Sequence, residues 1–400
     1  MKIYKQSLAA LIIIYVMVMA GCEYDGPTAQ WKLVEEETDS PRITEVVPSV
    51  AVPGVNFLTI NGENFTDDPS KVSVYINGYN AEIVDFSNSS IKIRRPDRSA
   101  DSLSIKVQVY GAVNLGRWEP YTITSVYEPI GQFLTGTSLG CLAVDKDENV
   151  YVAENTATRD IYKITPSGEK TLIANADRAI RGAAMDANGK LYFFRDRREI
   201  YVVEPDTVAL YATLSKNVGI GVFDSYGTLY ASGNRADINI VTSDLSIKQA
   251  GFYPSDEIIC LRVFDNFLYA LIELSSSDES HPEMAIWRHQ ILDAQGDLGD
   301  AELVFDWASA GEEYAESTPA TFTIESTGGI YIGSDNEAPI LYYNQSTKKM
   351  EAIYKGIIPS AAMKLLWGNG NYLYMIYSGG SSDYNLFRID MGHPEDRDYY

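Results

Sequence analysis

Short runs of alternating hydrophobic and polar residues recur along the chain after residue 40, and they predict strands rather than helices. After about residue 125 the runs follow a three-part pattern. An apolar strand ends near an Asp, a turn follows, and an aliphatic residue followed by Tyr opens a second strand; the stretch Gly140 to Lys170 is the clearest copy. The aliphatic–Tyr step occurs six times, at Val150-Tyr151, Leu191-Tyr192, Leu229-Tyr230, Leu268-Tyr269, Ile330-Tyr331 and Leu373-Tyr374.

The copies lie about 40 residues apart, except for a longer interval that marks an insertion in the fourth copy. This period, with several short strands in each copy, is typical of propeller blades. The sequence therefore predicts a six-bladed β-propeller over residues 125–400. Its inner strands are expected at Gly140 to Asp145, Arg181 to Asp186, Gly219 to Asp224, Ile259 to Phe264, Ala320 to Glu325 and Lys364 to Asn369.

The sixth copy has no outermost strand of its own, because a polar tail follows Ile389. The segment Pro129 to Leu134, ahead of the first inner strand, is predicted to supply that strand. Such closure joins the two ends of the propeller in one sheet and leaves no exposed edge. The Asp at each strand end is predicted to cap the following turn, and the repeat tyrosines are predicted to belong to the core.

Residues 41–124 contain a second set of alternating runs, at 57–60, 72–76, 91–93 and 103–110, separated by Asn-Gly and similar turns. This pattern predicts a small Ig-like β-sandwich. The fold class is therefore all-β, a sandwich followed by a six-bladed propeller. The basic cluster Lys92, Arg94, Arg95 and Arg98 is interpreted as a solvated edge that blocks strand pairing with other chains. Contact with acidic lipids or an acidic glycan is the alternative.

The N-terminal 21 residues differ from the rest. Lys2 and Lys5 precede an uncharged apolar run, Leu8 to Ala20, which is followed by Gly21 and Cys22. A basic start, a short apolar core and small residues form a secretory signal, and the run is too short to span a bilayer. Residues 22–40 are rich in Asp and Glu and are predicted to be a solvated acidic tether. The formal net charge of −23 makes nucleic acid an unsuitable partner.

Several of these segments resemble known families. Met19-Ala20-Gly21-Cys22 resembles a bacterial lipobox, which implies lipidation of Cys22 and attachment to the membrane through a lipid anchor only. The acidic residues that follow resemble the surface-export signals of Bacteroidetes lipoproteins, which implies the outer membrane, facing the cell exterior. Residues 41–124 resemble the IPT/TIG family at Ile43, Pro48, Gly54 and the run from Leu58 to Phe65. The first two propeller copies resemble NHL repeats.

Loops on one propeller face carry the candidate ligand residues. These loops precede the inner strands or join the second and third strands of each copy. Aromatic rings beside amide, carboxylate and guanidinium groups suit a sugar, because sugar C–H faces stack on rings while hydroxyls accept and donate hydrogen bonds. The predicted ligand-binding residues are Trp307, Tyr314, Tyr253, Tyr377, Tyr384, Arg181, Arg195, Asn234, Arg235, Asp335 and Asn336.

A lipid-anchored Ig-like spacer before a recognition domain resembles the surface glycan-binding lipoproteins of polysaccharide-utilisation systems. The leading hypothesis is therefore a protein that binds an extracellular glycan for an outer-membrane importer. A gluconolactonase-like hydrolase or lyase is the alternative, and a protein-interaction scaffold is the third class. No cofactor is expected, although Glu154, Asn234, Asp335 and Asn336 are of the types that bind Ca²⁺. Cys141 and Cys260 are predicted to be buried and unbridged.

Overall fold

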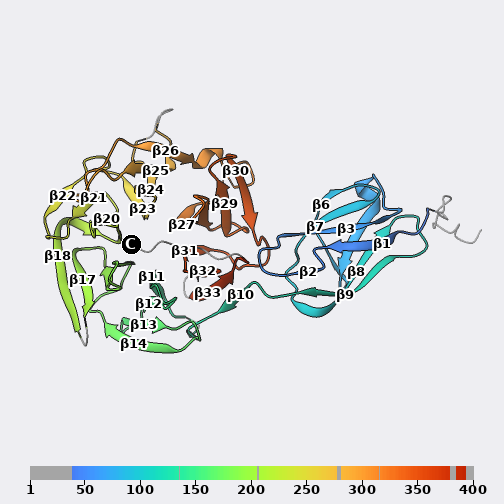
Figure 1. The fold of residues 1–400 in the computed structure, drawn as a ribbon, viewed down its shortest axis with the longest axis horizontal. Coiled ribbons are helices and arrows are strands. Elements are labelled where there is room, and N and C mark those ends of the chain that lie inside the picture. The colour runs from blue at the N-terminus through green and yellow to red at the C-terminus, as the bar shows by residue number, and fades with distance from the viewer. Residues whose placement is uncertain are drawn as a thin grey trace, which may run out of the picture.

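The computed structural model describes residues 38–134, 136–204, 207–276, 281–314, 316–378 and 384–392. These residues form a β-sandwich and a ring of small sheets, which lie side by side along the long axis of the molecule (Figure 1). In this part of the chain no helix is both long and apolar enough to cross a membrane. The predicted signal segment, Cys22 and the tether up to residue 37 lie outside the described residues.

The sandwich has two sheets, with strand orders β1-β3-β7-β6 and β2-β9-β8-β4-β5. Leu58, Ile60, Ile91 and Ile93 are fully buried between the sheets, and the residues between them face outward. This period of two places one face of each strand in the core. The strands are β1 (Arg42–Val47), β2 (Val50–Ala51), β3 (Phe57–Glu63), β4 (Val72–Ile76), β5 (Tyr79–Asn80), β6 (Ile83–Phe86), β7 (Ser90–Arg94), β8 (Ala100–Val109) and β9 (Gly116–Ile123).

Arg95 corrects the interpretation of the basic cluster as a solvated edge. Its side chain is only 2% exposed, and its guanidinium donates hydrogen bonds to the carbonyl oxygens of Val52, Val55 and Thr124. A planar group with five donors suits several carbonyls at once. Arg95 therefore fixes the loop after β2 to the end of the sandwich, where the chain leaves for the ring.

The ring contains six four-stranded antiparallel sheets among the described residues. The first three are β11 (Leu139–Val144), β12 (Val150–Glu154), β13 (Asp160–Ile164), β14 (Lys170–Asn175); β15 (Gly182–Met185), β16 (Leu191–Phe194), β17 (Arg197–Glu204), β18 (Thr207–Val218); and β19 (Ile220–Phe223), β20 (Leu229–Gly233), β21 (Ala236–Val241), β22 (Ile247–Gln249). The next two are β23 (Glu257–Phe264), β24 (Phe267–Glu273), β25 (Met284–Gln290), β26 (Glu302–Asp306); and β27 (Pro319–Ile324), β28 (Ile330–Ser334), β29 (Ile340–Asn344), β30 (Lys349–Ile353). The sixth has the order β10-β33-β32-β31, from β10 (Tyr127–Pro129), β31 (Ala362–Trp367), β32 (Tyr372–Ser378) and β33 (Tyr384–Asp390).

The first strands of successive sheets contact one another from β11 through β31, and β31 contacts β11, so the ring is closed (Figure 1). Strand β10 pairs with β33, with Tyr127 opposite Ile389. The predicted closure is therefore confirmed, although its strand is Tyr127–Pro129 rather than Pro129 to Leu134. The inner strands lie within about two residues of their predicted positions. These small sheets are compatible with a β-propeller.

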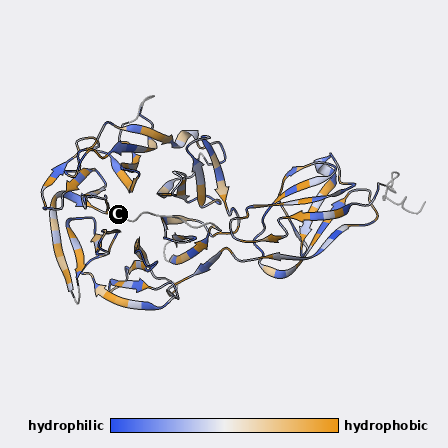
Figure 2. Cartoon of the chain, viewed as in Figure 1, coloured by the Kyte–Doolittle hydropathy of each residue, from blue (hydrophilic) through white to orange (hydrophobic). Residues whose placement is uncertain are grey.

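Large apolar side chains fill the spaces between neighbouring sheets, as Trp367 and Tyr374 do in the sixth sheet. Hydrophobic and hydrophilic residues alternate along many strands (Figure 2). Cys141 and Cys260 are buried and free, as predicted.

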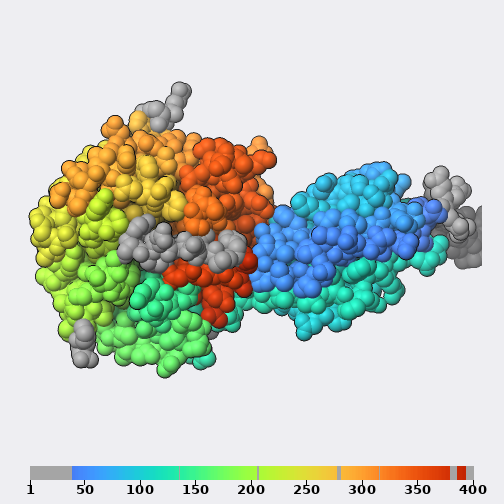
Figure 3. Space-filling view, in the orientation of Figure 1, coloured from blue at the N-terminus to red at the C-terminus, as the bar shows by residue number. Residues whose placement is uncertain are grey.

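The sandwich contacts the ring at its fifth and sixth sheets, where blue atoms meet orange and red ones in Figure 3. The Gly54 amide donates to the Tyr354 hydroxyl (2.6 Å), and that hydroxyl donates to the Asp390 carbonyl oxygen (2.9 Å). The loop fixed by Arg95 therefore supplies the contact with the ring.

Candidate functional site

The middle of the ring holds a cavity of about 720 Å³. We call it the central cavity. All six inner strands contribute to its wall, together with the turns that follow three of them. The apolar part of the wall includes Leu142, Val144, Met185, Val222, Phe223, Phe264, Ile324 and Leu366. Its polar groups lie mostly in the turns, at Ser225, Asp265, Asn266, Ser326 and Thr327.

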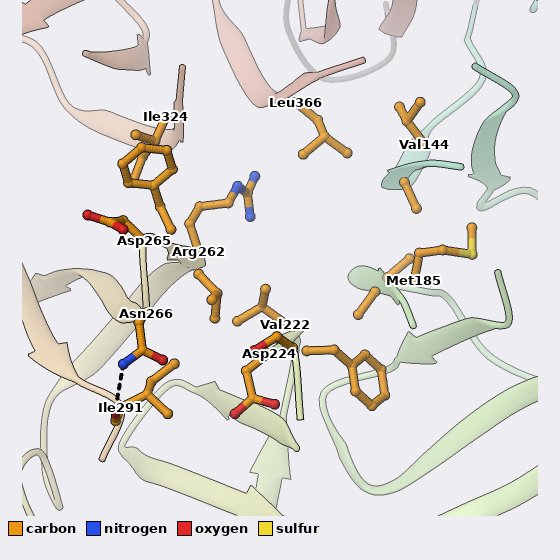
Figure 4. Close-up of a pocket in the computed structure, with 18 of the residues that line it drawn as sticks. Val144, Met185, Val222, Asp224, Arg262, Asp265, Asn266, Ile291, Ile324 and Leu366 are labelled. Carbon is orange, nitrogen blue, oxygen red and sulfur yellow. Dashed lines mark hydrogen bonds between the residues drawn. The ribbon is translucent and has the colours of Figure 1, made fainter. Parts of the chain in front are cut away.

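Arg262 is the cationic side chain in this wall. It comes from the middle of β23, and Figure 4 shows its guanidinium extended toward the centre of the cavity. The guanidinium donates to the carbonyl oxygens of Leu261 and Leu365, both at 2.8 Å. The second bond reaches β31, two inner strands away around the ring. These bonds hold the guanidinium across the channel.

The repeat Asp residues are structural, as predicted for the turns. In each of three copies, one carboxylate oxygen accepts hydrogen bonds from the backbone amides two and four residues later. The other oxygen accepts from the repeat Tyr hydroxyl, six residues after the Asp. In this way the turn and the second strand share one carboxylate. The pairs are Asp145–Tyr151, Asp186–Tyr192 and Asp224–Tyr230, and Glu325–Tyr331 resembles them.

Asp224 shows what this role implies for chemistry. It lines the cavity but is only 2% exposed, and burial raises the pKa of its carboxyl. Its bonds to the Thr228 amide (2.8 Å) and the Tyr230 hydroxyl (3.1 Å) offset that cost. The carboxylate is therefore engaged in holding the fold.

The sixth copy has no Asp at this place, and a side chain from the first sheet replaces it. Glu148, in the turn after β11, accepts hydrogen bonds from the amides of Asn369 (2.6 Å) and Gly370 (3.2 Å) and from the Tyr374 hydroxyl (3.1 Å). The Asn369 carboxamide donates in return to the Asp145 carbonyl oxygen (2.7 Å). The first and sixth sheets are therefore joined by side chains as well as by the pairing of β10.

Three of the aromatic residues predicted at the ligand site are in the core instead. Trp307, Tyr314 and Tyr253 are each less than 10% exposed, at 7%, 8% and 6%. The Trp307 indole donates to the Ser317 carbonyl oxygen (2.9 Å), and the Tyr253 hydroxyl bonds to the His289 imidazole (2.8 Å). These loops fold back onto their sheets, so the expectation of exposed rings was wrong for them.

The predicted arginines lie in two environments. Arg195 is 7% exposed, forms an ion pair with Asp177, and stacks over the Tyr201 ring at 3.9 Å. These contacts show that the Arg195 guanidinium stabilises the fold. Arg181 is exposed and pairs with Asp196 at 3.0 Å.

The remaining predicted residues lie in separate loops or at strand ends. Asn234 and Arg235 are exposed, and the Asn234 carboxamide faces Glu257 at 3.4 Å. Asp335 accepts from the Thr318 amide (2.8 Å), and Asn336 donates to the Glu313 carbonyl oxygen (3.4 Å). Tyr377 is half-buried and packs against Phe387, with ring centroids 5.8 Å apart. Tyr384 begins β33, and its side chain lies outside the described part of the chain.

None of these predicted residues lines the central cavity, as far as the described residues show. They lie in or beside the loops that precede the inner strands or join the second and third strands. The cavity is walled instead by the inner strands and the turns that follow them. Sequence reasoning also missed Arg262. The available signal was a cation inside the otherwise apolar run IICLRVF of an inner strand.

Within the described ranges, no three His, Cys, Asp or Glu residues gather closely enough to hold a metal ion. The residue types considered for Ca²⁺, such as Asn234 and Asp335, make hydrogen bonds within their own loops or to a neighbouring strand.

Comparison with known proteins agrees with a sandwich followed by a ring of small sheets. Residues 41–125 match the model of the IPT/TIG domain. An auxiliary nutrient binding protein from Bacteroides thetaiotaomicron has a similar structure (TM-score 0.52, 12% identity, covering 90% of this chain and 99% of that one). A putative phosphatase from the same organism is also similar (TM-score 0.52, 14% identity, covering 90% and 99%).

A putative gluconolactonase resembles a shorter part of the chain (TM-score 0.51, 11% identity, covering 68% of this chain and 94% of that one). No curated protein has a matching sequence. At these identities the likeness shows the fold alone. The chain is therefore a two-part all-β protein with an IPT/TIG domain and a ring of small sheets resembling those of nutrient binding proteins and gluconolactonases.

Proposed function

We propose that this chain is a cell-surface binding protein, and that its ring, a six-bladed β-propeller, captures an extracellular glycan. The central cavity carries the proposal. Its volume of about 720 Å³ lies within the range of roughly 300–1,000 Å³ that is usual for small-molecule sites. An oligosaccharide end of one or a few sugar units is the ligand that we infer for it.

The chemistry of the wall supports a sugar. The C–H faces of a pyranose pack on apolar and aromatic groups, and Phe264 and Met185 offer such surfaces. Hydroxyls require paired donors and acceptors, which Asn266, Ser326 and Arg262 provide. Because the wall consists of paired strands, it is largely formed before the ligand arrives, which lowers the entropic cost of binding.

The place of this protein in the cell is part of the proposal. The leader and Cys22 support a lipid anchor in the outer membrane, facing the cell exterior. The IPT/TIG domain then holds the ring away from the membrane, and components of an outer-membrane importer are the proposed partners. The similar fold of a protein described as an auxiliary nutrient binding protein supports this assignment.

A metal-dependent hydrolase or lyase is the second candidate, and the similar fold of a putative gluconolactonase favours it. If this second candidate is correct, the metal at the active site would be Ca²⁺. Turnover of a glycan that requires a metal ion would establish it, whereas capture of an importer component without glycan would favour a scaffold.

The test is calorimetric titration of the chain from Glu23 onward against plant, host and microbial polysaccharides, with and without Ca²⁺. We expect saturable heat from one glycan class, with the polymer unchanged afterwards. Met185→Trp adds bulk to the wall and should abolish that heat, because Met185 lines the cavity (Figure 4). Met363→Trp is the matched control, since Met363 is 41% exposed and lies outside the cavity wall.

Equal binding by wild type and Met185→Trp would remove the ligand from the central cavity. It would return attention to the loops that carry Arg181, Asn234, Arg235, Asp335 and Asn336. The absence of heat from every glycan would overturn the proposed function.

A further inference from the structure

The inner end of the central cavity carries two cationic side chains. Arg262 lines both the central cavity and a smaller cavity of about 40 Å³ beyond it, and Lys364 from β31 lines the smaller one. The Arg262 guanidinium bonds to the carbonyl oxygen of Leu365, the residue next to Lys364. The two cations therefore both border the smaller cavity, and we call them the cationic floor.

Lys364 lies partly exposed in the wall of the smaller cavity. The structure gives its ammonium no hydrogen bond and no ion pair to any described residue. An ammonium group in a narrow cavity has less water around it than one at the surface, so it gains more from pairing with an anion. An anionic ligand in the smaller cavity would therefore supply a counter-charge that no described residue supplies.

The groups around Lys364 agree with this reasoning. Burial holds the pKa of Lys364 below its usual value, and the charges of Arg262 and Arg181 act in the same direction. The thiols of Cys260 and Cys141 oppose the shift, but burial raises the pKa of Cys141 to about 12, so that thiol stays neutral near pH 7. An anion bound beside Lys364 would favour its charged form.

We propose that the ligand of the central cavity is an acidic saccharide, and that Arg262 and Lys364 bind its anionic group at the cationic floor. The inference rests on the proposed function and adds the chemical class of the ligand. A guanidinium binds carboxylate and sulfate oxygens with two parallel bonds, and an ammonium adds a compact charge. The smaller cavity has room for that group, while the apolar wall of the central cavity takes the sugar ring.

The net charge of −23 restricts the ligand further. Long-range repulsion opposes a polyanion as it approaches, and the attraction at the floor acts only at short range. The site is therefore suited to a saccharide with one anionic group near its end.

The experiment compares matched probes on the chain from Glu23 onward. The probes are glucuronate-terminated and galacturonate-terminated disaccharides, their methyl esters, the corresponding sulfated disaccharides and inorganic sulfate. We expect one acidic disaccharide to bind, and its uncharged counterpart to bind at least about 30-fold more weakly, because the ester removes the negative charge that the two cations attract. Preference for the uronate or for the sulfate ester identifies the source of the anionic group.

Lys364→Met separates a binding role from a structural one. Replacing an unpaired ammonium by an apolar side chain of similar length should leave the melting temperature of the free protein unchanged or raise it. The same variant should lose the binding of the acidic disaccharide by about 30-fold. Lys216→Met, at an exposed site, is the control and should change neither value. Arg262→Lys, which keeps the charge but loses the planar fork, should weaken the acidic probe selectively.

Each outcome decides the inference. Equal binding of neutral and acidic disaccharides, or full affinity in Lys364→Met, would overturn the cationic floor while the proposed glycan function stands. Binding of inorganic sulfate that is lost in Lys364→Met, with no saccharide bound, would support the floor and overturn the glycan function. If none of the probes and no glycan binds, both are overturned.

Discussion

Glu148 provides a sharp test of how the ring is held closed. It is a residue of the first sheet whose carboxylate accepts hydrogen bonds from the Asn369 and Gly370 amides and from the Tyr374 hydroxyl of the sixth sheet. Tyr374 is only 1% exposed, and burial together with the Glu148 charge raises its pKa. Glu148→Ala would leave a buried hydroxyl and two turn amides without their acceptor.

The expected cost follows from these contacts. A hydrogen bond to a charged group contributes about 1.5–3 kcal/mol, and a buried donor without a partner costs about 1–3 kcal/mol. Water can replace part of the acceptor at the two amides, so we expect a loss of about 2–4 kcal/mol in the free energy of unfolding. For a domain of this size, that loss corresponds to a fall in melting temperature of about 4–16 °C.

The assay is urea denaturation together with thermal unfolding, arranged as a double-mutant cycle with Tyr374→Phe. Because the two side chains share a bond of 3.1 Å, the cycle should give a coupling free energy of about 1 kcal/mol or more. Asp147→Ala, at the exposed neighbouring position, is the control and should stay within about 0.5 kcal/mol of wild type. Strictly additive effects, or a Glu148→Ala protein as stable as wild type, would refute the reasoning.

Two further predictions concern the core and the closing strand. His289 is fully buried, and burial lowers its pKa. As the pH falls through about 6.5, the unfolded chain therefore takes up a proton at this residue while the folded chain does not. The contribution of His289 to stability is therefore retained above about pH 6.5, and the free energy of unfolding falls by up to about 1.4 kcal/mol per pH unit below it. Urea unfolding at pH 7.5 and 5.5 should show a smaller loss of stability on acidification in His289→Gln than in wild type. Equal losses in the two proteins would contradict this origin. Replacing Tyr127–Pro129 by glycines removes the edge contact of Tyr127 with Phe387 (5.3 Å) and weakens pairing with β33. We expect the ring to melt in one transition at a lower temperature in calorimetry, and an unchanged melting temperature would argue against closure by β10.

The inner strands and the repeat Asp turns could be predicted because their causes are local. An apolar strand, an Asp and a turn lie within a few residues of one another, so the amides that the Asp caps are set by the chain itself. Asp186, for example, accepts from the amides of Asn188 and Lys190 at 2.9 and 2.8 Å. The same turn recurs in several copies, which makes the pattern visible in the sequence.

Burial of the loop aromatics has no such local cause. Asp306 caps a single turn of 3-10 helix, η2 (Trp307–Ser309), and this turn directs Trp307 back toward its sheet. The Trp307 side chain then packs between the fourth and fifth sheets, where its indole donates a hydrogen bond to the Ser317 carbonyl oxygen. From its polar composition alone, this loop is predicted to be exposed, and only its backbone conformation shows that Trp307 is buried. The sequence therefore overestimates the aromatic surface available to a ligand.

Arg262 is difficult to recognise as a site residue in one copy of the repeat, but it stands out when the same strand position is compared across all six copies. The inner-strand residue directly opposite each repeat Tyr is Ala143, Ala184, Val222, Arg262, Thr323 or Leu366. Only Arg262 is charged among these six, and it is the one that reaches across the channel to β31. Taken alone, a cation in β23 resembles a tolerated surface residue. Compared by register, it is charged where the other five positions are uncharged, and this difference supports the proposed role of Arg262 in binding a ligand.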